Sequence, residues 1–213
     1  SFCSLNNQLR AGLNMGIAGI PWWTTDIGGF HGGNIQDPSF RELLIRWFEF
    51  GTFCPVMRLH GFREPFKEPI GKSGGGKCLS GADNEVWSYG EEVYEICRKY
   101  LILREKMRPY IRSVMEQAHK SGAPVMRPLF FDFPADMDAW EVEDEYMFGP
   151  DILVAPILQE GGRSRQLYLP EGEWRELYDG RLYQGNTIIE AAASLDCIPV
   201  FIRKDKLAEV TFQ

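Results

Sequence analysis

The first part of the chain places apolar residues at helical and then at strand-like spacing. In residues 4–19 an apolar side chain recurs at every fourth position, which predicts an amphipathic helix that ends near Gly19. Residues 19–27 form a short apolar and β-branched stretch, which predicts a strand. The chain is therefore expected to begin with a helix followed by a strand.

A second helix and a second strand follow in the same order. Asp37 fits the N-cap of a helix, Pro38 fits its first position, and an apolar stripe extends to about Gly51. Residues 54–61, CPVMRLHG, predict another short strand. Helices and strands that alternate in this way predict an α/β fold with parallel strands.

Two longer segments complete this half of the chain. Residues 61–90 are rich in Gly, Pro and Lys and have no apolar periodicity, which predicts a long loop that is functional or mobile. Residues 90–122 carry the longest helical pattern in the sequence. We expect Pro109 to kink or split this helix and Gly122 to end it.

The pattern changes after residue 123. Short apolar or alternating stretches, separated by Pro, Gly and Asp, continue to the end of the chain and predict an all-β unit of the sandwich or barrel type. We therefore expect two units, an α/β unit of residues 1–122 and an all-β unit of residues 123–213.

Charge and hydropathy narrow the classes of function. The 213 residues carry a formal net charge of -7, which argues against a nucleic-acid or anionic-membrane partner. No apolar run approaches the roughly 20 residues that span a bilayer. The first ten residues, SFCSLNNQLR, lack the basic start and apolar run of a signal peptide. Because a helical pattern is already under way there, we expect a segment of a longer protein.

Cysteines and possible ligand motifs give no support for a metal or a cofactor. The five cysteines are odd in number and lack CxxC spacing, which predicts free thiols in a reducing, cytoplasmic compartment. No histidine stands near a cysteine at zinc-ligand spacing. The glycine-rich residues 71–77 depart from the phosphate-loop pattern, because Cys78 follows Lys77. The acidic residues 136–149 lack the spacing of a calcium loop.

Asp26 is the first candidate for a binding site. It lies where a predicted strand gives way to a glycine-rich loop, and ligands of parallel α/β folds bind beyond the carboxyl ends of the strands. A carboxylate flanked by Trp22, Trp23 and Phe30 suits a sugar, because aromatic faces cover C–H groups and the carboxylate accepts hydroxyl hydrogen bonds. The alternative is that Asp26 caps a turn and the tryptophans belong to the core.

Arg58 and His60 are the next candidates. They alternate along the second predicted strand, so they share one face at its C-terminal end. Arg58 could hold a carboxylate through two hydrogen bonds, and His60 could donate to a hydroxyl. The alternatives are a structural ion pair for Arg58 and a buried, hydrogen-bonded histidine. Together with Asp26, one strand earlier, a shared site is the favoured interpretation.

Several motifs resemble those of glycoside hydrolase family 31, the family of α-glucosidases and α-xylosidases. They are GIPWWTTDIGGFHGG, VMRLHG, MRPYIRS, PVMRPLFFDFPAD, DEYMFGPDILVAPIL and YLPEGEWREL, in family order and over nearly the whole chain. The resemblance implies the C-terminal segments of a (β/α)8 TIM barrel, with strands seven and eight ending at Asp26 and near His60. It implies a proximal β-sandwich domain from residue 123.

The resemblance also implies that this chain binds the sugar, whereas the catalytic residues lie elsewhere in the protein. Asp26, Arg58 and His60 would hold the sugar in the -1 subsite, and Phe30 would line the pocket. The nucleophile and the acid/base would be aspartates in motifs upstream of this chain, which therefore contains no catalytic residue of its own. A retaining glycosidase needs two carboxyl groups about 5 Å apart, so we expect the segment alone to be inactive.

Three functions compete at this point. The first is part of a retaining hydrolase of terminal α-linked glucosyl or xylosyl residues, without a metal or organic cofactor, with glucosides favoured as the commoner substrate. The second is a non-catalytic carbohydrate-binding or structural module, and the third is a related α-transferase or lyase. Two strands cannot close a barrel. The expected partner, besides an oligosaccharide or α-glycoside substrate, is thus the N-terminal part of the same protein or a second copy, unless the segment folds against its own β unit.

Overall fold

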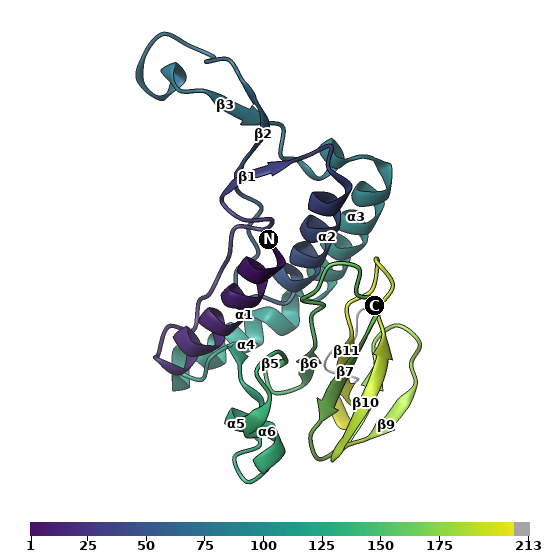
Figure 1. Cartoon of the computed structure of the whole chain (residues 1–213). Helices are drawn as coiled ribbons and strands as arrows, with labels where there is room; N and C mark the ends of the chain where they lie inside the picture. Colours follow the sequence, from purple (N-terminus) through teal and green to yellow (C-terminus); the bar gives the residue numbers. More distant parts are fainter. Residues whose placement is uncertain (207–213) are drawn as a thin grey trace.

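Four helices of 14 to 16 residues form one side of the molecule in a computed structural model that describes residues 1–206 (Figure 1). They are α1 (Phe2–Ile17), α2 (Pro38–Thr52), α3 (Glu91–Lys106) and α4 (Arg108–Ser121). Helix α2 packs against α3, and α1 lies against strand β4 (Met126–Arg127). The helices predicted from the apolar spacing are all present.

The ends of these helices follow the sequence signals. The Asp37 carboxylate caps α2 by accepting the backbone N–H of Ser39 at 3.0 Å. The long helical pattern is split next to Pro109, with Met107 between α3 and α4. Gly122 ends α4 in the left-handed conformation, with φ at 76°, which a residue without a Cβ adopts at little cost.

The two expected barrel strands are present as extended segments without regular strand geometry. The Val56 N–H donates to Trp23 O at 3.1 Å, and the Ile27 N–H donates to Arg58 O at 3.2 Å. Both bonds advance in the same direction along the two segments, so the expected parallel pairing is formed.

The expected long loop at residues 61–90 contains two strands and two short 3-10 turns, which corrects the prediction that it lacks secondary structure. Strand β2 (Phe62–Lys67) pairs in parallel with β1 (His31–Asn34) and antiparallel with β3 (Ser80–Ala82). The β2–β3 hairpin projects beyond the helices, and short 3-10 turns follow each of its strands (Figure 1). Strand β2 has no apolar alternation because most of its side chains are exposed.

The second half of the chain is mainly antiparallel sheet, as predicted. One sheet has the strand order β4–β5–β6–β11–β8–β9, and β7 and β10 form a separate antiparallel pair. The further strands are β5 (Tyr146–Phe148), β6 (Ile152–Val154), β7 (Ser164–Leu169), β8 (Glu173–Glu176), β9 (Leu182–Gln184), β10 (Thr187–Ala192) and β11 (Val200–Arg203). Two short helices, α5 (Leu129–Asp132) and α6 (Met137–Glu141), lie within the half that was expected to be all-β.

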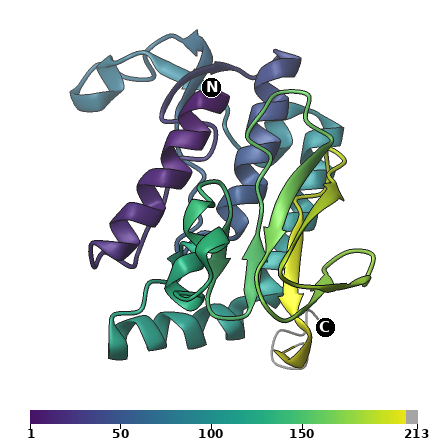
Figure 2. The same ribbon diagram turned by 60° about the horizontal axis from the view of Figure 1, so that its bottom comes forward.

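The central strands of the larger sheet are buried on both faces. In β5, Tyr146 and Phe148 join the core shared with the helices, whereas Met147 joins the core on the opposite face. Strands β6 and β11 repeat this alternation. The sheet is therefore the middle of three layers, between the helices and the β7–β10 pair (Figure 2).

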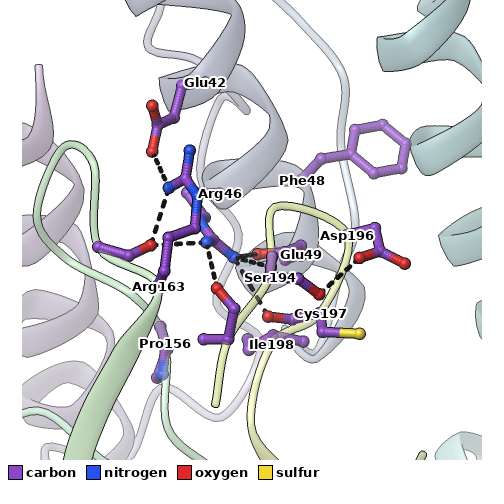
Figure 3. A network of polar contacts seen from close by, with 12 residues as sticks. Glu42, Arg46, Phe48, Glu49, Pro156, Arg163, Ser194, Asp196, Cys197 and Ile198 are labelled. Atoms are coloured by element: carbon purple, nitrogen blue, oxygen red, sulfur yellow. Dashed lines mark hydrogen bonds and ion pairs between the residues drawn. The ribbon is translucent and has the colours of Figure 1, made fainter.

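A buried arginine joins the helical half to the β half. The guanidinium of Arg46, on α2, is inaccessible to solvent and pairs with Glu49 at 3.0 Å (Figure 3). It also donates to four backbone carbonyls of the β half at 2.9 to 3.2 Å, those of Gly162, Ala193, Ser194 and Cys197. Because a buried charge is costly without hydrogen-bond acceptors, these contacts fix the second half of the chain against α2.

Glu49 extends this junction. Its other carboxylate oxygen accepts the Tyr100 hydroxyl at 3.1 Å, and the same hydroxyl oxygen accepts the N–H of Ile198 at 3.1 Å. Burial raises the pKa of Glu49 to about 8, although Arg46 and Tyr100 oppose the shift. At the edge of the junction, Lys99 forms an ion pair with Asp196 at 2.9 Å. Helices α2 and α3 thus both contact the loop that precedes β11.

Candidate functional site

The candidate site lies where the two extended parallel segments end. Helix α2 holds the first segment through a hydrogen bond, in which the Trp47 indole N–H donates to the Thr25 hydroxyl at 2.7 Å. Both side chains are buried, and Thr25 directly precedes Asp26. In an extended segment neighbouring side chains point to opposite faces, so anchoring Thr25 to the core turns Asp26 away from it.

Asp26 and Arg58 form an ion pair across the two segments. The Arg58 Nε donates to Asp26 Oδ1 at 2.9 Å, and its Nη2 makes a second contact with the same oxygen. The Asp26 side chain is 17% exposed and the Arg58 side chain 51%. Among the described residues, none donates a side-chain hydrogen bond to Asp26 Oδ2. The pair thus presents a free acceptor and further guanidinium N–H donors to solvent.

Phe30 and His60 form an exposed aromatic contact beside this pair. Their ring centroids are 5.5 Å apart, with the planes tilted by 32°. The backbone holds them together, because the Phe62 N–H donates to Phe30 O at 2.7 Å. Phe30 is 58% exposed, although it is a large apolar side chain. An exposed aromatic surface next to polar groups is typical of a binding site.

The two tryptophans of the first segment lie differently. Trp22 is 61% exposed. Trp23 is half-buried and packs against α1, so closely that a Cβ on Gly12 would lie 2.7 Å from its indole ring. The structure therefore gathers Asp26, Arg58, Phe30 and His60 at one end of the two segments and turns Trp23 toward α1.

A buried arginine next to the site was missed at the level of sequence. Arg63, on β2, is inaccessible to solvent, and its guanidinium donates to Ile27 O at 2.7 Å and to Gly29 O at 2.6 Å. A charged residue in a polar stretch is ordinarily exposed, so no pattern in the sequence distinguishes Arg63 from its neighbours.

Other reactive groups lie away from this site. All five cysteines are free, and burial raises the pKa of the Cys54 and Cys97 thiols to about 12, which keeps them as unreactive thiols. Within residues 1–206, no three His, Cys, Asp or Glu side chains converge as metal ligands would. In the same residues, every helix is too short or too polar to cross a bilayer.

Comparisons with known proteins agree with the fold. Residues 1–114 match the model of the glycosyl hydrolases family 31 TIM-barrel domain, and residues 122–207 match that of the family 31 C-terminal domain. An α-xylosidase of Saccharolobus solfataricus is 37% identical over 203 residues, which are 95% of this chain and 25% of that protein.

Solved structures give the same result. The crystal structure of a family 31 α-xylosidase from a soil metagenome, complexed with xylose, has a TM-score of 0.94 and 59% identity, over 99% of this chain and 32% of the other. A family 31 dextranase of Flavobacterium johnsoniae, complexed with glucose, has a TM-score of 0.83 and 33% identity, over 96% and 23%. The chain thus spans about a quarter to a third of these relatives. It belongs to glycoside hydrolase family 31, with residues from both the catalytic TIM barrel and the C-terminal domain.

Proposed function

We propose that this chain is part of a retaining α-xylosidase, to which it contributes the side chains that hold the sugar next to the scissile bond. The observation that carries the proposal is the grouping of Asp26, Arg58, Phe30 and His60 at one end of the paired segments, in a chain of a glycosidase family. The exposed aromatic ring and the charged pair offer the two kinds of contact that a pyranose makes.

Each side chain has a separate task in this proposal. The free oxygen of Asp26 accepts sugar hydroxyls, Arg58 fixes that carboxylate and donates from its outer N–H groups, and His60 donates to a neighbouring hydroxyl. Phe30 covers the apolar face of the ring. The exposed Trp22 would widen this aromatic surface, and Trp23 would support the segment from its position on α1.

The chemical step itself is assigned to groups outside this chain. Double displacement requires a carboxylate nucleophile and a carboxylic acid about 5 Å apart on either side of the bond. Asp26 is paired with Arg58 and cannot serve as both groups. We therefore expect the isolated segment to bind sugar weakly and to hydrolyse nothing, which an assay of the purified segment beside the full-length protein would check.

Xylosides are proposed over glucosides because of the similarity to the xylose-bound α-xylosidase, which extends over nearly the whole chain at 59% identity. This changes the preference for glucosides that rested on frequency alone. The test is hydrolysis of nitrophenyl α-xyloside and nitrophenyl α-glucoside by the full-length protein. A higher kcat/KM for the xyloside supports the proposal, a higher value for the glucoside reverses the substrate, and no hydrolysis of either contradicts both.

The rest of the barrel is the proposed partner of this segment. An apolar hollow of about 640 Å³ lies beside the second extended segment, lined among others by Met57, Leu59, Trp87 and Leu101. Trp87 is 67% exposed. Because a closed barrel covers both edges of every strand, the preceding barrel segments of the same protein would fill this hollow.

A further inference from the structure

We infer that Arg63 is a positioning residue of the sugar site, which holds the glycine loop, defined here as residues 27–32, in the shape that presents Asp26 and Phe30. The inference rests on the proposed function, because it concerns how that same site is held. The guanidinium donates to Ile27 O at 2.7 Å, to Gly29 O at 2.6 Å and to Gly32 O at 3.2 Å. One side chain thus spans the loop from end to end.

The buried positive charge of Arg63 requires hydrogen-bond acceptors around it. The side chain is fully buried, and no carboxylate within residues 1–206 forms an ion pair with it. Its Nε donates to the Tyr89 hydroxyl at 3.1 Å and to Asn84 Oδ1 at 3.2 Å, and its Cζ lies 5.3 Å from the centre of the Phe40 ring. A buried charge without these acceptors would be costly, so a loop that moves away from Arg63 leaves it unsatisfied.

Glycines on both sides of the site permit this close approach. A Cβ on Gly28 would lie 2.9 Å from Arg63 Nη2, and a Cβ on Gly61 would lie 2.5 Å from Nη1. Both glycines also have positive φ angles, 83° and 155°. Gly28 is two residues after Asp26, and Gly61 directly follows His60. The guanidinium is therefore packed between the two chain segments that carry the sugar-binding side chains.

Arg63 itself contacts none of the four proposed sugar-binding side chains in the described structure. Its effect would pass through the backbone of the loop, whose carbonyl directions it sets. In the Arg63→Lys variant a single ammonium group replaces the planar guanidinium. It cannot reach all five acceptors of Arg63, which are three loop carbonyls, the Tyr89 hydroxyl and Asn84 Oδ1. We expect the loop to loosen and the sugar to bind about tenfold more weakly, because preorganisation is lost.

The experiment uses the full-length protein with Arg63→Lys, and with Arg127→Lys as the matched control. Arg127 is also a buried arginine, 2% exposed, but it pairs with Asp132 in the β half, away from the site. Three quantities are measured for each variant: the KM for nitrophenyl α-xyloside, the inhibition constant of xylose, and the rate of amide hydrogen exchange in residues 27–32 without sugar. The melting temperature reports the general loss of stability.

The expected result is a rise of about tenfold in KM, in the inhibition constant and in exchange of the loop for Arg63→Lys. Arg127→Lys should lower only the melting temperature. If Arg63→Lys lowers the melting temperature but leaves KM and loop exchange within about twofold of wild type, the inference is wrong. If that variant does not fold, Tyr89→Phe, which removes one acceptor of Arg63, must still accelerate loop exchange, or the inference fails.

Failure of the proposed function can be distinguished from failure of the inference on Arg63. A wild-type protein that neither binds xylose nor hydrolyses either nitrophenyl glycoside contradicts the function whatever Arg63 does. Exchange of residues 27–32 in the sugar-free protein would then still decide whether Arg63 holds the loop.

Discussion

Asp26 carries the sharpest residue-level prediction. Its Oδ1 accepts both contacts from Arg58, which leaves Oδ2 as the acceptor for a ligand. Asp26→Asn keeps the size of the side chain and removes the charge. Since a hydrogen bond to a charged group contributes about 1.5–3 kcal/mol, kcat/KM of the full-length protein should fall about 10- to 100-fold. Hydrolysis of nitrophenyl α-xyloside measures this.

The matched control for Asp26→Asn removes an exposed charge elsewhere. Glu116 pairs with Lys120 on α4 at 2.7 Å, and both side chains are mostly exposed. Solvent screens exposed ion pairs of this kind, and this pair lies on α4, so Glu116→Gln should leave kcat/KM unchanged. An Asp26→Asn variant that behaves like Glu116→Gln would remove Asp26 from the site.

At the scale of elements, α2 connects the core to the site through one buried hydrogen bond. Thr25→Val keeps the shape of the side chain but leaves the Trp47 N–H without its acceptor, which should cost about 1–3 kcal/mol. Trp47→Phe removes the donor and some volume. Because each change abolishes the same bond, the double variant should be less destabilised than the sum of the single variants by about 1 kcal/mol or more.

Urea unfolding of the two single variants and the double variant gives this coupling. The same proteins should show reduced kcat/KM, because the segment that carries Asp26 loses its support from α2. Strict additivity of the free energies of unfolding would mean that the bond between Thr25 and Trp47 contributes nothing, and that α2 positions the segment by packing alone.

Some of the elements and site residues could be predicted from the sequence, and others could not. The helices were predictable because their apolar residues repeat at the spacing that faces a core. The proximity of Asp26 and Arg58 was predictable because parallel segments end at one edge, whereas the sugar-binding role of Asp26, Arg58 and His60 stays a prediction. Strand β2 and Arg63 were not predictable. Strand β2 forms through backbone pairing, and because most of its side chains are exposed, they show no apolar alternation. The acceptors of Arg63 are mainly backbone carbonyls of the glycine loop, and backbone carbonyls cannot be recognised from the order of side chains.

At the scale of the whole molecule, the junction of the two halves should respond to pH. Burial holds the pKa of Glu49 at about 8 in the folded protein, above its ordinary value of 4.5. Between these values the folded protein keeps a proton that the unfolded chain has lost. The contribution of Glu49 to stability is therefore complete below about pH 4.5 and is lost as the pH rises to about 8, by at most about 1.4 kcal/mol per pH unit.

Glu49→Gln mimics the protonated form and should flatten this dependence. Its amide can still accept from Arg46 and face the Tyr100 hydroxyl, so the variant should remain folded at neutral pH. Denaturation midpoints from about pH 5 to about pH 8 should fall less steeply than in wild type. Burial also raises the pKa of Glu145 to about 8, within the β half, so Glu145→Gln is the matched control that keeps the slope due to Glu49. If Glu49→Gln is instead less stable at every pH by a constant amount, Glu49 is ionised in the fold and joins the halves as a true ion pair with Arg46.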